Sequence, residues 1–144
     1  MESTTASVAG NAIAPPVRVA LQDDSGAIVR GADGAVRLTL MQAGAGGTLS
    51  GVALAMSQDG VATFSDLSID RAAQGYVLVA TAGTLPATSS VPFAVSAAAP
   101  SALVFTTQPA DVVAGVALLP SPVVELRDRF GNLTAATSSI TVTP

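Results

Sequence analysis

Residues 53–64 read Ala-Leu-Ala-Met-Ser-Gln-Asp-Gly-Val-Ala-Thr-Phe, and this stretch decides the fold class of the chain. An Asp-Gly pair at 59–60 separates two short apolar segments, 53–57 and 61–64. A type I′ hairpin turn needs a positive φ at both central residues, which an Asp-Gly pair adopts readily. The stretch therefore predicts two antiparallel strands joined by a two-residue turn.

The same period of two recurs along the chain. Four runs alternate large apolar residues with other residues, which is typical of half-buried strands. Turn residues bound these runs at intervals of about ten residues, as in sandwiches and barrels. The alternating positions are Val17, Val19 and Leu21; Val36, Leu38 and Leu40; Val52, Leu54 and Met56; and Val91, Phe93 and Val95. We therefore expect an all-β chain in which these side chains face the core.

The composition excludes several classes of function. Hydrophobic residues make up 49% of the 144 residues, enough to bury a core, and charged residues only 11%. Six arginines, no lysine and ten acidic residues give a net charge of −4, so nucleic acid is not an expected partner. The absence of Cys and His removes thiolate metal sites, disulfides and the commonest general base. We expect no enzyme activity and no resident cofactor.

The chain contains an internal repeat with an offset of 105 residues. Segment 8–15, Val-Ala-Gly-Asn-Ala-Ile-Ala-Pro, returns at 113–120 as Val-Ala-Gly-Val-Ala-Leu-Leu-Pro. With the same offset, Val19, Leu21, Asp23 and Gly26 return as Val124, Leu126, Asp128 and Gly131, so nine of the 21 positions from Val8 to Ile28 are identical. Because the matches include Gly, Pro and Asp at fixed spacing, we interpret them as a true repeat.

The repeat divides the chain into two unequal units. Residues 1–97 form a first unit, 98–102 a linker and 103–144 the first three strands of a second, truncated unit. An apolar strand begins at 103, whereas its counterpart is missing from the first unit, where residues 1–6 are small and polar. The third strand of the second unit is expected at 139–143, by alignment with 35–39. We expect a first unit without its first strand, as if cut out of register from a longer array.

Longer motifs in both units identify a family resemblance. The second unit carries Leu-Val-Phe-Thr-Thr-Gln-Pro at 103–109 and Leu-Arg-Asp-Arg-Phe-Gly-Asn at 126–132. The first carries Gly-Gly-Thr-Leu-Ser-Gly at 46–51, a Gly-Val-Ala-Thr-Phe segment at 60–64 and Gly-Tyr-Val-Leu at 75–78. Together they resemble the bacterial immunoglobulin-like repeats of surface and secreted proteins, broadly similar to invasin and intimin stalk domains. The resemblance implies an immunoglobulin-like β-sandwich, a spacer or adhesion-stalk role beside neighbouring repeats, and no catalytic residues.

No export or membrane signal is visible in the sequence. Met1–Ser7 lacks the basic and apolar regions of a signal peptide. No apolar run approaches the about 20 residues that a membrane helix needs. A composition rich in Ala, Ser, Thr, Gly and Val is compatible with an extracellular domain. We expect an extracellular or cell-surface location in a parent protein, without membrane insertion.

An alternative function is a ligand-binding module, for calcium or carbohydrate, that uses end loops. Asp23, Asp24 and Asp33 could gather at one end of a sandwich and bind calcium, which takes carboxylate and carbonyl oxygens. Asp is also frequent in tight turns because its side chain bonds the local backbone. The second copy keeps Asp128 but replaces the equivalent of Asp24 with Arg129, so a turn-forming role is our first interpretation.

Two further features concern Asp66, Asp70 and Tyr76. The two carboxylates lie four residues apart around a turn and are remote candidates for a weak hydrolase, which needs paired carboxyl groups. Solvated surface carboxylates are the simpler interpretation. Tyr76 follows Asp70 and Arg71 at a strand start, as in the tyrosine corner of sandwich folds, where the hydroxyl bonds upstream backbone. We expect Tyr76 to be structural.

The strand at 103–107 is a candidate oligomer interface. Leu103, Val104, Phe105, Thr106 and Thr107 belong to a unit with too few strands for a stable domain, whereas the first unit lacks a first strand. The six-residue link before them spans at most about 20 Å, so insertion within one chain is marginal. Exchange between chains has no such limit. We expect a homodimer or short fibre; the alternative is a monomer with a loose tail.

Overall fold

A computed structural model describes residues 7–41, 46–141 and 143, all in strands, turns and irregular segments. The expectation of an all-β chain is confirmed for these residues. Among them, no helix is long and apolar enough to cross a membrane. The chain divides into unit 1, Met1–Ser96, and unit 2, Ala97–Pro144. The strands are β1 (Ser7–Val8), β2 (Val17–Ala20), β3 (Ala35–Met41), β4 (Leu49–Ser50), β5 (Leu54–Met56), β6 (Val61–Phe64), β7 (Ser68–Ile69), β8 (Ala73–Thr81), β9 (Thr88–Ser89), β10 (Phe93–Ser96), β11 (Ala102–Thr107) and β12 (Val123–Arg127).

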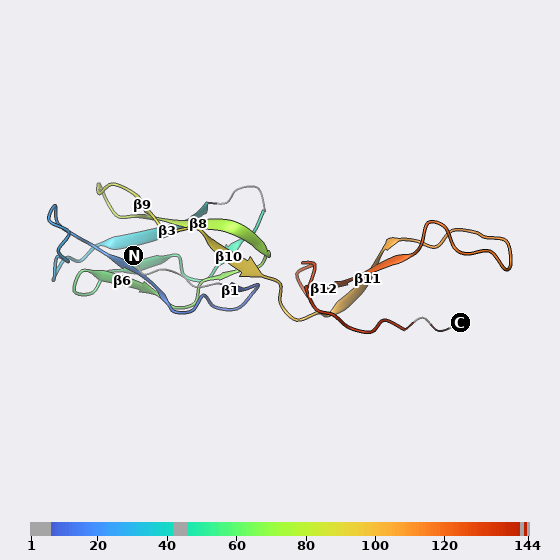
Figure 1. The fold of residues 1–144 in the computed structure, drawn as a ribbon. Coiled ribbons are helices and arrows are strands. Elements are labelled where there is room, and N and C mark those ends of the chain that lie inside the picture. The colour runs from blue at the N-terminus through green and yellow to red at the C-terminus, as the bar shows by residue number, and fades with distance from the viewer. Residues whose placement is uncertain (1–6, 42–45, 142, 144) are drawn as a thin grey trace. The chain divides into compact units, whose positions relative to one another are not determined.

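Six strands of unit 1 form one sheet (Figure 1). The strand order is β1-β10-β8-β3-β5, and β9 pairs with β8 outside this path. β1 runs parallel to β10, whereas the other pairs are antiparallel. The nine-residue β8 pairs with β3 from Val77↔Met41 to Thr81↔Arg37. The sheet is therefore built around the β8–β3 pair, with β1 and β5 at its edges.

Two short strand pairs, β2–β6 and β4–β7, supply the second layer of unit 1. β2 pairs antiparallel with β6 from Val17↔Phe64 to Ala20↔Val61. Their buried side chains belong to the same apolar cluster as those of the six-stranded sheet, so the two layers share one core. The buried members are Ala9, Ile13, Val17, Val19, Val36, Leu38, Ala62, Phe64, Leu67, Ile69, Tyr76, Leu78, Ala80, Phe93 and Val95. Unit 1 is thus sandwich-like.

The two-residue turn between β5 and β6 forms as predicted, but the two strands do not form a hairpin ladder. β5 pairs with β3 and β6 pairs with β2, and only an isolated bridge joins Gln58 to Val61. Asp59 and Gly60 both have positive φ, 49° and 79°. Gln58 and Val61 exchange two backbone hydrogen bonds of 2.9 and 3.0 Å across the turn. A Cβ at Gly60 would collide with the carbonyl oxygen of Val29, so glycine is required there by space as well as by φ. The Asp-Gly pair therefore fixes the two-residue turn.

The expected orientation of Val52, Leu54 and Met56 is wrong. These side chains are 61%, 51% and 61% exposed, and they lie on the outer side of the strand. The reason is register: β5 pairs with β3 so that Ala55 lies opposite buried Val36. Opposite residues of paired strands share a face, so the alternate set containing Ala55 turns inward. Val91, expected to face the core with Phe93 and Val95, is likewise exposed.

The missing first strand of unit 1 was expected at residues 1–6, which lie outside the described residues; the edge of β10 carries a short strand just after them. Ser7 and Val8 pair in parallel with Val95 and Ser96. Ala9 N–H donates to the carbonyl of Ser96 at 2.8 Å, which extends the pairing by one bond. This segment covers the end of β10, while no described strand pairs with the edge of β2 opposite β6.

Unit 2 is a two-stranded antiparallel ribbon. β11 pairs with β12 from Ala102↔Arg127 to Thr107↔Val123, with an irregularity after Phe105. None of its described apolar side chains is buried. Of the third strand expected at 139–143, residues 139–141 and 143 lie outside any strand, and residue 142 lies outside the described residues. The ribbon therefore has strand geometry without a core.

Candidate functional site

The loop at 22–28 is organised by the carboxylate of Asp23. Its Oδ1 accepts the N–H of Ser25 at 2.9 Å, the hydroxyl of Ser25 at 2.6 Å and the N–H of Ala27 at 3.0 Å. The Ser25 hydroxyl, followed by the backbone N–H groups of Ala27 and Ser25, lowers the pKa of Asp23. The Asp23 carboxylate therefore stabilises the turn in which it lies.

The loop at 127–133 repeats this arrangement at the offset of 105 residues. Asp128 Oδ1 accepts the N–H groups of Phe130 and Asn132, both at 2.9 Å, two and four residues downstream as in the first loop. Gly131 N–H donates to Asp128 O at 3.0 Å with φ 82°, as Gly26 donates to Asp23 O at 2.9 Å with φ 83°.

The flanking hydrogen bonds of the two loops also correspond. Val29 N–H donates to Leu21 O at 2.9 Å, and Thr134 N–H donates to Leu126 O at 2.9 Å. Isolated bridges join 22 to 28 and 127 to 133. The two loops therefore have one conformation, set by the Asp and Gly that both copies retain.

Asp128 has a second task that the sequence reasoning missed. Its Oδ2 accepts the N–H of Ala98 and the side-chain amide of Asn132, both at 2.9 Å. Although burial opposes its ionisation, hydrogen bonds from Asn132, Ala98 and Phe130 outweigh this effect and lower the pKa of Asp128. Asp128 thus ties the segment before β11 to the loop after β12. The sequence offers no signal for this contact, because Ala98 lies 30 residues upstream and the counterpart of Asn132 in the first copy is Ala27.

The calcium candidates Asp23, Asp24 and Asp33 are not assembled into a site. All three are exposed, and Asp23 Oδ1 is occupied by hydrogen bonds of its own loop. Within residues 7–41, 46–141 and 143, no three acidic, His or Cys side chains are grouped to hold a metal ion.

Asp66 and Asp70 both fasten the segment that contains β4. The two oxygens of Asp66 accept the N–H of Val52 at 3.1 and 3.2 Å, and Asp70 Oδ1 accepts the N–H of Thr48 at 2.7 Å. Each carboxylate therefore accepts a hydrogen bond from a different backbone N–H group.

Tyr76 forms the contact that the sequence predicts. Its hydroxyl donates to the carbonyl of Arg71, upstream in the chain, at 2.9 Å. The side chain is fully buried, and its ring lies 6.1 Å from that of Phe93. Gly47 lies against the hydroxyl, where a Cβ would approach to 2.5 Å. Tyr76 therefore locks the turn before β8 and the backbone at residue 47 to the core.

The candidate interface residues Leu103, Val104, Phe105, Thr106 and Thr107 all lie in β11. Leu103 and Phe105 stand on one side of the strand, and they are 60% and 49% exposed. Their register partners on β12 are Leu126 and Val124. These apolar side chains pair across the ribbon but are not covered.

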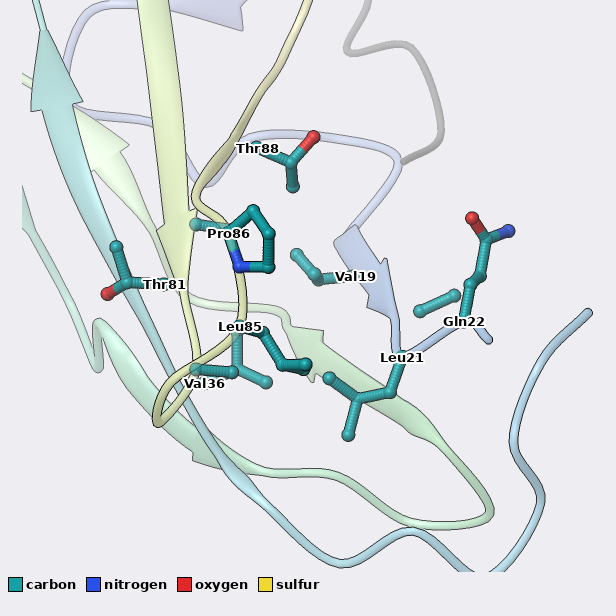
Figure 2. Close-up of a pocket in the computed structure, with 11 residues that line it drawn as sticks. Val19, Leu21, Gln22, Val36, Thr81, Leu85, Pro86 and Thr88 are labelled. Carbon is teal, nitrogen blue, oxygen red and sulfur yellow. The ribbon is translucent and has the colours of Figure 1, made fainter. Parts of the chain in front are cut away.

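A pocket of about 200 Å³ lies beside β2 in unit 1 (Figure 2). Leu21 and Leu85 point toward one another in it, with Val19, Val36 and Pro86 around them. The remaining lining residues are Ala20, Gln22, Ala80, Thr81, Ala82 and Thr88. Most lining residues are apolar and none is ionisable, although polar atoms contribute about as much of the lining surface as apolar atoms. The pocket therefore suits a small uncharged side chain better than a charged ligand.

Comparison with known proteins adds no assignment. No family model, no curated protein and no solved structure matches this chain. The contacts described above are therefore the basis for a proposed function.

Proposed function

We propose that the chain is a structural spacer built from immunoglobulin-like sandwich modules, of the kind found in bacterial surface and secreted repeat proteins. The observation that carries the proposal is that the loop at Asp128 repeats the backbone hydrogen bonds of the loop at Asp23. The second loop keeps the Asp and Gly that form the turn, whereas Arg129 replaces the other carboxylate of the first loop, Asp24. A loop that is repeated in this way has a role in folding. A ligand site repeated in two modules keeps its ligands instead.

The segment between the two units supports a spacer role. β10 ends at Ser96 and β11 begins at Ala102, so five residues connect them. Two of these five are held by unit 2: Ala98 N–H by Asp128 Oδ2, and Ser101 N–H by the carbonyl of Arg127 at 2.8 Å. These two bonds restrict the backbone at the start of unit 2, and a spacer is better served by such restricted connections than by a flexible linker.

The ends of unit 1 also suit a protein under tension. β1 and β10 are parallel neighbours, with Val8 opposite Ser96. A pull on the chain before β1 and after β10 acts along both strands in opposite directions. The bonds between them, including Ala9 N–H to Ser96 O at 2.8 Å and Ser96 Oγ to Ser7 O at 3.2 Å, are then loaded together in shear. Bonds in shear break together, whereas bonds peeled from one end break singly.

The proposal is tested by the calcium dependence of thermal unfolding. The chain is melted in EDTA and in millimolar calcium, together with Asp23→Asn and the matched control Asp33→Asn. A spacer melts at the same temperature in both solutions, and Asp23→Asn lowers that temperature equally in each because it weakens a turn. A saturable rise with calcium that Asp23→Asn abolishes overturns the spacer in favour of a ligand-binding module, because a ligand that binds only the folded state stabilises it.

A further inference from the structure

β2 and β12 occupy equivalent positions in the two units but are paired on different edges. Leu21 N–H donates to Gly60 O at 2.7 Å, so residues 17, 19 and 21 face β6, and the backbone of Arg18 and Ala20 faces away from it. In unit 2 the carbonyl of Arg127 accepts Ser101 N–H, so Arg127 and Glu125 face β11. At the offset of 105, Glu125 corresponds to Ala20. β11 therefore covers the edge that in β2 pairs with no described strand.

The pocket described above lies along this edge of β2. Val19, Ala20, Leu21 and Gln22 form one wall of it (Figure 2). We call the unpaired edge at Arg18 and Ala20, together with this pocket, the β2 slot. It offers an unpaired strand edge beside a pocket without ionisable side chains, which is what an added strand with uncharged side chains requires.

We propose that the β2 slot receives β11 of a second copy of this chain, in the register that β11 adopts with β12. The register follows from the offset of 105: Leu103 lies opposite Leu21, Val104 opposite Ala20 and Phe105 opposite Val19. The inference rests on the proposed function in one respect, since it takes the two units as copies of one module. Reciprocal exchange closes a dimer, and head-to-tail exchange extends a fibre.

The side chains of β11 fit the slot in this register. Opposite residues of paired strands point to the same face, so Leu103 and Phe105 join Leu21 and Val19 on the core side. On that side lies the pocket of about 200 Å³, whose lining includes Val36, Leu85 and Pro86. In their own unit the same two side chains are largely exposed, so exchange keeps the number of strand bonds and adds apolar burial. Val104 stays on the outer face beside Ala20.

The length of the link favours a second copy over the same chain. Val95 pairs with Ala73 at the first end of β8, whereas the pocket lies at its other end, at Ala80 and Thr81. The eight steps from Ala73 to Thr81 span about 26 Å, and the two layers are about 10 Å apart. The seven steps from Ser96 to Leu103 reach about 25 Å when fully extended. β11 therefore falls short of the β2 slot of its own chain.

Site-directed disulfide formation tests the register. The chain contains no cysteine, so only the introduced cysteines can form a disulfide. A chain with Ala20→Cys is mixed with a chain with Val104→Cys and oxidised. Opposite positions of paired strands lie within disulfide reach. The control replaces Ala20→Cys with Thr63→Cys, an exposed position on β6, beyond the paired edge of β2. We expect a cross-linked species of about 28 kDa, twice 14.1 kDa, from the first mixture and none above background from the control.

Light scattering of chains without cysteine supplies the second measurement. We expect a mass of twice the monomer or more. In Phe105→Asp we expect the monomer mass and an unchanged circular dichroism spectrum, because Phe105 is exposed in its own unit. Equal cross-linking in both mixtures, or a disulfide within one chain carrying both Ala20→Cys and Val104→Cys, overturns the exchange. A monomer that melts independently of calcium also overturns the exchange while the spacer role stands.

Discussion

Gly47→Ala is expected to destabilise unit 1 through one contact, the hydroxyl of Tyr76. An added Cβ lies 2.5 Å from that oxygen and 3.2 Å from both the ring Cζ and Ile69 Cγ2. The hydroxyl cannot swing aside, because the ring is fully buried and the hydroxyl is bonded to Arg71 O. Tyr76→Phe removes the oxygen and leaves only the contacts at 3.2 Å. The effect of the alanine therefore depends on the residue at position 76.

The magnitudes follow from overpacking and hydrogen-bond energies. Gly47→Ala alone costs about 2 kcal/mol by forced displacement of a packed ring. Tyr76→Phe alone costs about 1 kcal/mol, the net value of one hydrogen bond. In the Tyr76→Phe background the alanine is within about 0.5 kcal/mol of neutral, since reduced freedom of the unfolded chain offsets the remaining crowding. The coupling energy between the two positions is then about 1.5 kcal/mol.

Urea unfolding of the four chains, followed by far-ultraviolet circular dichroism, measures this cycle. Circular dichroism is used because Tyr76→Phe removes the single tyrosine signal. A difference of 2 kcal/mol corresponds to about 10 °C in Tm for a unit of this size, so melting curves provide a second readout. Additive effects of Gly47→Ala and Tyr76→Phe, or a Gly47→Ala chain as stable as the parent, refute the lock between Tyr76 and residue 47.

Three more outcomes are expected. Leu38→Ala, in the core, costs about 3 kcal/mol in urea unfolding, whereas Leu54→Ala, on the outer face, changes stability by less than about 0.5 kcal/mol; equal losses contradict the assigned strand faces. Burial first, and the charge of Asp70 second, raise the pKa of Tyr76, so tyrosine ionises first in the unfolded state and stability falls as pH rises above about 10. Tyr76→Phe is expected to flatten that alkaline slope in urea titrations. The lowered pKa of Asp23 contributes stability above the ordinary value of 3.8 that is lost as pH falls through the folded pKa, so Asp23→Asn melts with a weaker dependence on acid pH than the parent.

Features set by neighbouring residues could be predicted from the sequence. The Asp59-Gly60 turn requires two adjacent residues with positive φ, and both are visible in the chain. The Tyr76 bond reaches a carbonyl only five residues upstream. The inward positions of Val36 and Leu38 follow from simple alternation, because Arg37 between them is charged and Thr39 after them is polar.

The inward face of residues 52–57 could not be predicted in the same way. Both alternate sets are apolar there: Val52, Leu54 and Met56 on one side, and alanines on the other. The choice is made by the pairing of Ala55 with Val36, a contact between residues 19 positions apart. Alternation identifies a strand, but only register with its neighbour decides which set is buried.

The candidate sites likewise differ in whether their contacts are local or distant in the sequence. The turn role of Asp23 is local and could be inferred from residues 23–27. The anchoring of Ala98 by Asp128 spans 30 residues, and the pairing of Ser7 with Val95 spans 88, so neither has a local signal. The turn accounts for one carboxylate oxygen of Asp128, and only the fold shows that the other oxygen binds Ala98.

The central claim is that unit 1 is a spacer that withstands tension, and single-molecule stretching tests it most directly. The whole chain is held between two folded handle domains and extended. Val8 and Ser96 are neighbours in the fold and 88 residues apart in the chain, so unfolding of unit 1 releases about 300 Å of chain. We predict one distinct force peak per molecule with this gain in length, because the β1–β10 bonds yield together. A smooth extension without a peak, or release in several short steps, contradicts the claim.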